Sequence, residues 1–184
     1  MPNRQTNWII IDGAHGEGGG QILRTALSLS AITHRPFRIE RIRALRRNPG
    51  LAAQHLTAVR SAAALCSAQL HGETLGSSSL AFATTATAEA GDYFFDVGLG
   101  REGGSAGAVT LVVQTILLPL AFATGDSRVE LRGGTHMAWS PPFEYVRDVW
   151  LPSLPASASK HPWNSLHGAG IRSAGARCVP TSGV

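Results

Sequence analysis

Lysine is nearly missing from this sequence, since the single lysine among its 184 residues is Lys160. Residues 1–150 therefore contain neither the lysine of a phosphate-binding P-loop nor a lysine that could carry a nucleotidyl group covalently. Those residues hold 13 arginines and all 12 acidic residues, a balance of +1, whereas the last 34 residues hold three basic residues and no acid. The pI of 9.8 therefore does not mean that residues 1–150 are basic as a whole. Only a local cluster of basic residues within them can indicate nucleic acid binding.

Cysteine and long apolar runs are scarce as well. Cys66 and Cys178 are the two cysteines, too few for a disulfide framework and without metal-ligand spacing. The longest strongly apolar run, residues 111–123, is shorter than the ~20 residues that a membrane-spanning helix needs. No basic and apolar leader precedes the first strand-like segment, so we predict a cytoplasmic protein without a membrane partner.

Two glycine-rich loops, each followed by a helical pattern, organise the rest of the chain. Residues 8–12 (WIIID) are predicted to form a buried strand, and a glycine-rich loop then leads to a helix that starts near Gln21. A second glycine-rich loop precedes a long apolar helix at about residues 107–123. A basic strand follows each helix, which predicts an α+β fold built from a repeated unit.

Further predicted elements divide the chain into three parts. Short strands are expected at 67–71, 79–84 and 92–97, a second helix at 54–66, and a helix that begins at the prolines of PPFEY. We expect residues 1–96 to form the first repeat and residues 97–154 to form part of a second. Residues 155–184 lack periodicity and acids, so we expect an aberrant, disordered tail, as a shift of reading frame after Leu151 would produce.

The segment GEGGGQILR, residues 16–24, is the first candidate site. Glycines let the backbone approach a ligand closely, and free N–H groups at the start of the next helix attract anions. Glu17 would repel a phosphate unless a divalent cation lay between them, and Arg24 could add a forked donor. The alternative is a tight turn in which Glu17 interacts with the helix dipole and Arg24 is solvated.

The second candidate is a basic patch: seven arginines lie between Arg35 and Arg60, against one acid, Glu40. Arg41 and Arg43 are expected on one face of a strand that spans residues 37–45. Arginine suits bidentate recognition of phosphate. The alternative is a solvated strand edge, and base stacking is weakly supported because Phe37 is the sole aromatic residue nearby.

Gln114 is the third candidate, because it is a long polar side chain within an otherwise apolar helix. A buried glutamine needs partners, which adenine or ribose edges would supply, although a satisfied core amide explains it equally well. The histidines, among them His55 and His136, show no ligand spacing and are more often structural. No Ser-His-Asp or Cys-His arrangement can be assembled.

Together these segments resemble the RNA 3'-terminal-phosphate cyclase family between about Ile9 and Leu154. The resemblance is carried by GEGGGQILRTALSLS, by NPGL followed by QHLTAVR, and by TLGSSSLAF, GDYFFDVG, GGSAGAVTLVVQT and SRVELRGGTHMAWSPPFEYVRDVWLP. It implies a fold of repeated two-helix, four-strand units that form the family's large α+β domain. It also implies a ligase that uses ATP and Mg²⁺ or Mn²⁺ to convert an RNA 3'-phosphate to a 2',3'-cyclic phosphate through adenylated intermediates.

The resemblance also implies roles for individual residues. Glu17 would hold the metal or the ATP phosphates, and Gln114 would contact ATP. The phosphate and RNA-end pocket would be lined by Arg24, Arg43, Arg46 and Gln54. The family's adenylated histidine lies beyond the matched part, so no histidine of this chain takes that role. RNA 3'-phosphate ends are the expected partner, and DNA is not.

Three departures from the family pattern bear on activity. Leu45 stands where the family usually has glycine, LGREGG looks like an insertion, and the resemblance ends near Leu154 although family members are longer. We therefore expect the 184-residue chain to be inactive by itself. A cyclase-like, non-catalytic factor in RNA processing or ribosome biogenesis is the alternative, and a pyruvyl- or phosphosugar-transferring enzyme is a weaker one.

Overall fold

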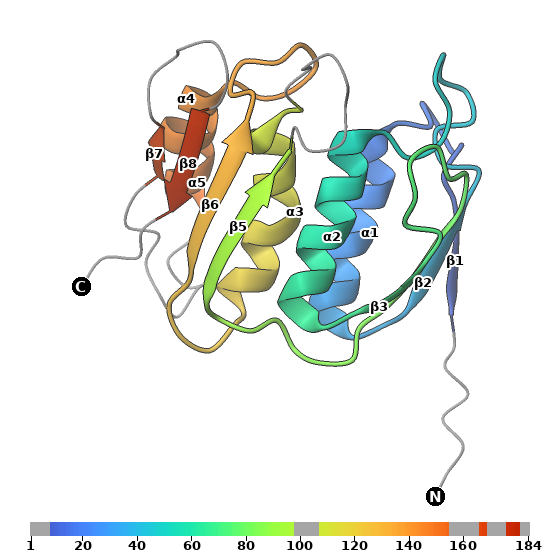
Figure 1. Cartoon of the computed structure of the whole chain (residues 1–184), viewed down its shortest axis with the longest axis horizontal. Helices are drawn as coiled ribbons and strands as arrows, with labels where there is room; N and C mark the ends of the chain where they lie inside the picture. Colours follow the sequence, from blue (N-terminus) through green and yellow to red (C-terminus); the bar gives the residue numbers. More distant parts are fainter. Residues whose placement is uncertain (1–7, 98–106, 155–165, 169–175, 181–184) are drawn as a thin grey trace, which may run out of the picture.

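Two four-stranded sheets lie on either side of three long helices in the computed structural model, which describes residues 8–97, 107–154, 166–168 and 176–180 (Figure 1). The first unit contains β1 (Ile9–Asp12), α1 (Gly20–Thr33), β2 (Phe37–Glu40), α2 (Ala53–Cys66), β3 (Gln69–His71) and β4 (Leu80–Ala83). The second contains β5 (Asp92–Asp96), α3 (Val109–Ala121), β6 (Arg128–Gly133), α4 (Phe143–Tyr145), η1 (Val146–Trp150), α5 (Leu151–Ser153), β7 (Leu166–Gly168) and β8 (Ala176–Pro180).

The two sheets share one topology. Their strand orders are β1-β2-β4-β3 and β5-β6-β8-β7, and in each the first two strands are parallel while the remaining pairs are antiparallel. A helix crosses over between the parallel strands, α1 in the first unit and α3 in the second. The α+β class and the repeated unit predicted from the sequence are therefore present.

The boundary between the units differs from the predicted one. β5 was assigned to the first repeat, but it pairs in parallel with β6, from Asp92 opposite Arg128 to Asp96 opposite Arg132. The second unit therefore includes residue 92 and does not begin at residue 97. A strand's own residues predict that it pairs, but they do not specify its partner, which depends on contacts distant in sequence.

Two strands lie in the segment that was expected to be a disordered tail. β8 pairs antiparallel with β6, and β7 pairs with β8. The backbone groups along that edge of β6 would otherwise lack partners, which is the physical reason for strand addition there. The other residues of the predicted tail, 155–165, 169–175 and 181–184, lie outside the described residues.

The first core lies between the first sheet and the helices α1 and α2. Leu23 and Leu27 of α1 are buried, and on β2 and β4 the rings of Phe37 and Phe82 stack with centroids 5.6 Å apart. β1 is less enclosed than predicted, because it is an edge strand and Ile10 on its outer face is 65% exposed.

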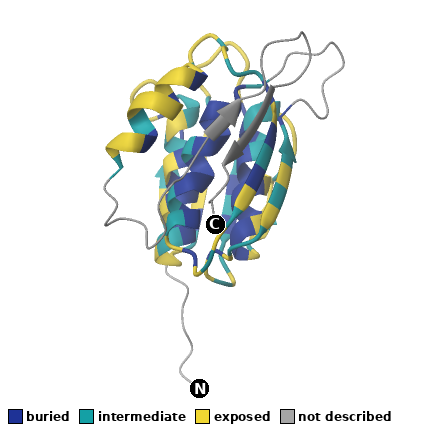
Figure 2. Ribbon diagram, turned by 90° about the vertical axis from the view of Figure 1, so that its left-hand side faces the viewer, coloured by how far each residue is buried: buried dark blue, intermediate teal, exposed yellow. Residues whose placement is uncertain are grey.

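The second core lies between the second sheet and α3, and it includes a residue of α2. Val112 and Ile116 of α3 pack with Leu131 of β6, and Leu65 of α2 belongs to the same cluster. Ser28 Oγ of α1 donates a hydrogen bond of 2.6 Å to the carbonyl of Thr115 in α3. The three helices thus form a shared, largely buried layer (Figure 2).

The last described helical segment begins at Phe143, directly after the prolines that the sequence predicts as its first turn, and it contains a π-helical turn. Leu151 N–H donates to the carbonyl of Val146, five residues earlier. Pro152 follows, and a proline has no N–H to continue an α-helical ladder. Among the described residues, no helix is both long enough and apolar enough to cross a membrane.

Candidate functional site

The glycine-rich loop joins β1 to α1 by a path that excludes a side chain at Gly13 and disfavours one at Gly18. A Cβ on Gly13 would lie 2.9 Å from the carbonyl oxygen of Glu40, and Gly18 has a φ of +57°. α1 then begins after Gly19, which offers no side-chain cap, and the first turn of the helix contains no acidic residue. The backbone N–H groups at this helix start are therefore available to an anion.

Gly20 is required because two side chains occupy the space above it. A Cβ there would overlap His55 Nε2 and would lie 2.9 Å from Arg24 Nη1. The imidazole from α2 and the guanidinium from α1 therefore meet over the first residue of α1. This contact brings the glycine-rich loop and the start of α2 together.

His55 is buried and neutral. Only 4% of it is exposed, and burial, together with the charges of Arg43 and Arg24, lowers the pKa of His55 to about 3. Its Nδ1 accepts a 3.2 Å hydrogen bond from the N–H of Ala52, so the proton is on Nε2. This arrangement fixes the ring at the start of α2 with an N–H donor directed toward Gly20.

The loop after β2 differs from the predicted strand. β2 ends at Glu40, and both Arg41 and Arg43 adopt left-handed backbone conformations, with φ of 55° and 53°. They therefore do not share a strand face. Ile42, which lies between them, is buried. Strand alternation alone could not predict this turn.

The arginines of this loop have different partners. Arg43 Nη1 donates a 2.9 Å hydrogen bond to the carbonyl of Gly50, and burial is the main cause that lowers the pKa of Arg43. Arg46 Nη2 lies 3.2 Å from Glu17 Oε2. A Cβ on Gly19 would lie 3.2 Å from the same Arg46 nitrogen, so Arg46 extends over the glycine-rich loop.

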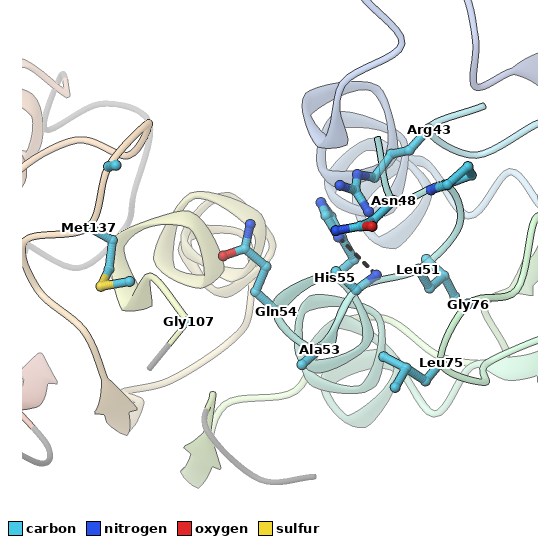
Figure 3. Close-up of a pocket in the computed structure, with 13 residues that line it drawn as sticks. Arg43, Asn48, Leu51, Ala53, Gln54, His55, Leu75, Gly76, Gly107 and Met137 are labelled. Carbon is cyan, nitrogen blue, oxygen red and sulfur yellow. Dashed lines mark hydrogen bonds between the residues drawn. The ribbon is translucent and has the colours of Figure 1, made fainter. Parts of the chain in front are cut away.

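A pocket of about 450 Å³ lies at the start of α2 and is formed by both units (Figure 3). Gln54 lies between Met137 on one side and Arg43 on the other. Gln54 Oε1 also accepts a 3.4 Å hydrogen bond from the N–H of Ala108, ahead of α3. The full lining is Arg43, Asn48, Pro49, Leu51, Ala52, Ala53, Gln54, His55, Leu75, Gly76, Gly107, Met137 and Ala138. We call this the interunit pocket.

Two of the predicted residues lie in a neighbouring pocket. Gln114 and Arg24 line a second cavity of about 250 Å³ between α1 and α3, together with Trp150. Arg24 is 8% exposed, its Nη2 donates to Gln21 Oε1 at 3.0 Å, and its buried Nε has no hydrogen-bond partner among the described residues. Burial lowers the pKa of Arg24.

The six predicted residues thus fall into three neighbouring groups. Arg43 and Gln54 line the interunit pocket, Glu17 and Arg46 form an exposed pair over the glycine-rich loop, and Arg24 and Gln114 line the second cavity. Arg24 connects the groups because it also contacts the space beside His55.

Sequence reasoning did not select several lining residues of the interunit pocket. His55 was treated as structural, although it follows Gln54 directly, at the start of a predicted helix. Asn48 was marked only as part of a turn. Met137 and Ala138 carried no signal, because their contribution depends on how the second unit packs beside α2.

A metal could be held only in part by the described residues. No group of three or more acidic, histidine or cysteine side chains lies together in the described ranges. The side chain of Glu17 is 91% exposed and can offer one carboxylate to a cation. The described side chains therefore do not form a complete ligand set here, and the missing ligands would have to come from a bound phosphate or from water.

Comparison with known sequences gives consistent matches. The sequence profile of the family described as RNA 3'-terminal phosphate cyclase matches residues 15–173, which extends past Leu154. A protein of Methylococcus capsulatus named RNA 3'-terminal phosphate cyclase is 64% identical over 144 residues, which cover 78% of this chain and 40% of that protein.

Two further relatives carry the same name. The protein of Trichormus variabilis is 61% identical over 146 residues, covering 79% of this chain and 42% of the relative. That of Salmonella enteritidis PT4 is 52% identical over 146 residues, covering 79% and 41%. The chain thus spans about two fifths of the length of these relatives.

Proposed function

Because the chain belongs to the RNA 3'-terminal phosphate cyclase family, we propose that it serves the ATP-dependent conversion of an RNA 3'-phosphate to a 2',3'-cyclic phosphate. Its part in that reaction is to bind the phosphate-bearing end of the RNA in the interunit pocket. The observation that carries the proposal is the convergence of Arg43 and His55 at the start of α2.

The polar side of the interunit pocket suits a phosphate. Arg43 uses one guanidinium nitrogen to hold the carbonyl of Gly50, which fixes the group and leaves further N–H donors for an anion. His55 is neutral but can donate through Nε2, and Ala52 has no side-chain oxygen to cap α2. A dianionic phosphate would gain from both donors and from the helix dipole.

The volume and shape of the interunit pocket suit a nucleotide. About 450 Å³ lies within the usual range for small-molecule sites. Leu75 and Met137 add apolar surface beside the polar residues, so a sugar and base could extend from a phosphate near Arg43. The RNA terminus would then be held by its phosphate and positioned by Gln54 and Asn48.

ATP and a divalent cation are assigned to the glycine-rich loop and the second cavity. ATP would supply the AMP leaving group that lets the 2'-hydroxyl attack the adjacent 3'-phosphorus. Glu17 would contribute a carboxylate to Mg²⁺ or Mn²⁺, Arg46 would neutralise phosphate charge, and Arg24 and Gln114 would contact ATP. Proximity and charge neutralisation would supply most of the rate enhancement.

Binding of matched oligonucleotides tests the proposal. The 184-residue chain is expected to bind an oligoribonucleotide with a 3'-phosphate at least tenfold more tightly than the same strand with a 3'-hydroxyl, as charge-assisted hydrogen bonds to phosphate would produce. Arg43→Ala should remove that preference. Arg38→Ala is the matched control, because Arg38 is an exposed arginine paired with Glu40 on the first sheet. Equal affinity for both ends would overturn the proposal.

The activity of this polypeptide alone is a separate question. The family resemblance implies that the adenylated histidine lies outside the segments that carry it, and on that ground we propose that the 184-residue chain forms no covalent adenylate with ATP and Mg²⁺. Incubation with radiolabelled ATP, followed by denaturing electrophoresis, checks this. A labelled band that survives denaturation would contradict it and would place a nucleophile within these residues.

A further inference from the structure

Trp139 is wholly exposed beside the interunit pocket. Its exposed fraction is 100%, and it follows Met137 and Ala138, both of which line that pocket. Single exposed apolar residues are ordinary on protein surfaces. A tryptophan with its whole surface in water, next to a polar pocket, is less common and needs an explanation.

The backbone of Trp139 makes the case stronger. Trp139 has a φ of +64°, in the left-handed region where glycine or asparagine is usual. It lies in a turn closed by hydrogen bonds from Ser140 N–H and Oγ to the carbonyl of Met137, at 3.2 and 2.8 Å. Tryptophan thus occupies a position where folding alone would favour a smaller residue.

The loop that carries Trp139 is fixed to its surroundings. His136 Nε2 lies 2.7 Å from Glu144 Oε2, and His136 Nδ1 lies 3.0 Å from Thr135 Oγ1. These contacts tie the loop to the start of α4. The indole is therefore presented from an anchored turn, which lowers the entropy lost when a ligand binds it.

We propose that Trp139 is a stacking platform for a base of the single-stranded RNA whose 3' end enters the interunit pocket. The inference rests on the proposed function for the choice of ligand. Tryptophan offers a large flat face to any base, and stacking on an aromatic ring is tolerant of sequence. The basic loop has no such group, because Phe37, the aromatic residue nearest to it in sequence, is buried.

The arginines near the interunit pocket and the position of Trp139 support RNA as the ligand of this site. Arg43 and Met137 line the same pocket from opposite sides of Gln54 (Figure 3). A strand whose end phosphate lies at Arg43 can therefore leave the pocket past Met137, and Trp139 follows two residues later in the chain. Arg47 is exposed on the loop that carries Arg43 and adds positive charge there, whereas Arg41 is paired with Asp12 at 3.1 Å. A polyanion with flat bases matches this combination of arginines and one exposed indole.

The test measures how base stacking depends on Trp139. Fluorescence anisotropy would compare a 3'-phosphorylated oligouridylate with the same strand made abasic at its last two nucleotides, using the full 184-residue chain. The intact strand should bind the wild-type chain about tenfold more tightly. Trp139→Ala should abolish that difference, Trp139→Phe should keep most of it, and Trp8→Ala, which removes an indole elsewhere, should leave it unchanged.

The outcomes separate this inference from the proposed function. If Trp139→Ala keeps both the base dependence and the 3'-phosphate preference, the stacking inference is overturned and the proposed function stands. If the 3'-phosphate preference is absent but Trp139→Ala still removes the base dependence, stacking is supported and the proposed function fails. Absence of RNA binding overturns both. A wild-type dimer that Trp139→Ala converts to a monomer would assign Trp139 to a protein contact and overturn the inference.

Discussion

At residue 55, a histidine is held in its neutral form by burial and by two neighbouring arginines. A group whose folded pKa is about 3 and whose unfolded pKa is 6.5 binds fewer protons in the folded state at intermediate pH. Above pH 6.5, His55 is neutral in both the folded and the unfolded state. As the pH falls from 6.5 toward 3, the unfolded state binds the proton more readily, so the free energy of unfolding decreases.

This titration gives a first prediction. Between pH 7.5 and pH 5, the free energy of unfolding of the wild-type chain should fall by about 2 kcal/mol more than that of His55→Gln, whose amide does not titrate. Urea unfolding at several pH values measures it. Above pH 5 the carboxylates contribute little to the change in the free energy of unfolding. If this free energy fell equally with pH in both proteins, protonation of His55 would not destabilise the fold and the prediction would be wrong.

Trp139 gives a second prediction, because its backbone conformation favours glycine. Trp139→Gly should raise the free energy of unfolding by about 0.5–1 kcal/mol, since the left-handed backbone is then unstrained. The same variant should bind RNA more weakly, so stability and binding would change in opposite directions. Urea unfolding beside the anisotropy assay measures both, and a destabilised Trp139→Gly variant would show that the indole makes folding contacts.

At the scale of single elements, β6 contributes buried residues to the second core. Leu131 on β6 is fully buried and packs with α3, while Arg128 on the same strand faces solvent. Leu131→Ala should lower the free energy of unfolding by about 2–5 kcal/mol, because it removes apolar contacts and leaves a cavity. Arg128→Ala should change it by less than about 0.5 kcal/mol. Thermal unfolding measures both, and equal small effects would mean that β6 is loosely packed.

Elements with strong periodicity could be predicted from the sequence. The helices that became α1, α2 and α3 have apolar faces of period 3.6, and the strands that became β3, β4 and β5 are bounded by turn residues. The strand at β2 was predicted too long, because the alternation in FRIERIRAL continues beyond Glu40 although Arg41 turns the chain. β7 and β8 carry no alternation strong enough to be recognised.

Only part of the candidate site could be predicted from the sequence. The cluster of arginines pointed to Arg43, the family resemblance pointed to Gln54, and both line the interunit pocket. Met137 could not be selected, because its position beside α2 depends on the packing of the second unit. The separation of Gln114 from that pocket is likewise a tertiary property, since it follows from where α3 crosses α1.

At the scale of the whole molecule, the helix layer joins the two sheets into one unit. α2 contributes Val59 to the first core and Leu65 to the second, and Ser28 of α1 donates a hydrogen bond to the carbonyl of Thr115 in α3. The described part of the chain should therefore unfold as one cooperative unit. This is expected even though the two sheets repeat one topology and could be mistaken for separate domains.

Core variants in each sheet test this cooperativity. Phe82→Ala in the first sheet and Leu131→Ala in the second should each reduce the hydrogen-exchange protection of both β2 and β6 amides, by similar free energies. Native-state hydrogen exchange measures it. If Phe82→Ala lowered the protection of β2 alone, the two sheets would open independently, and the helix layer would not couple them.

The shared helix layer also sets the order of events during synthesis on a ribosome. The first unit ends with β4 at Ala83, but α3 is completed only at Ala121. At elongation rates of about 5–20 residues per second, this gap is on the order of seconds. Throughout that interval, the faces of α1 and α2 that pack against α3 have no partner in the nascent chain. These exposed apolar faces are a binding site for chaperones, and the speed of translation between β4 and α3 can affect the yield of folded protein.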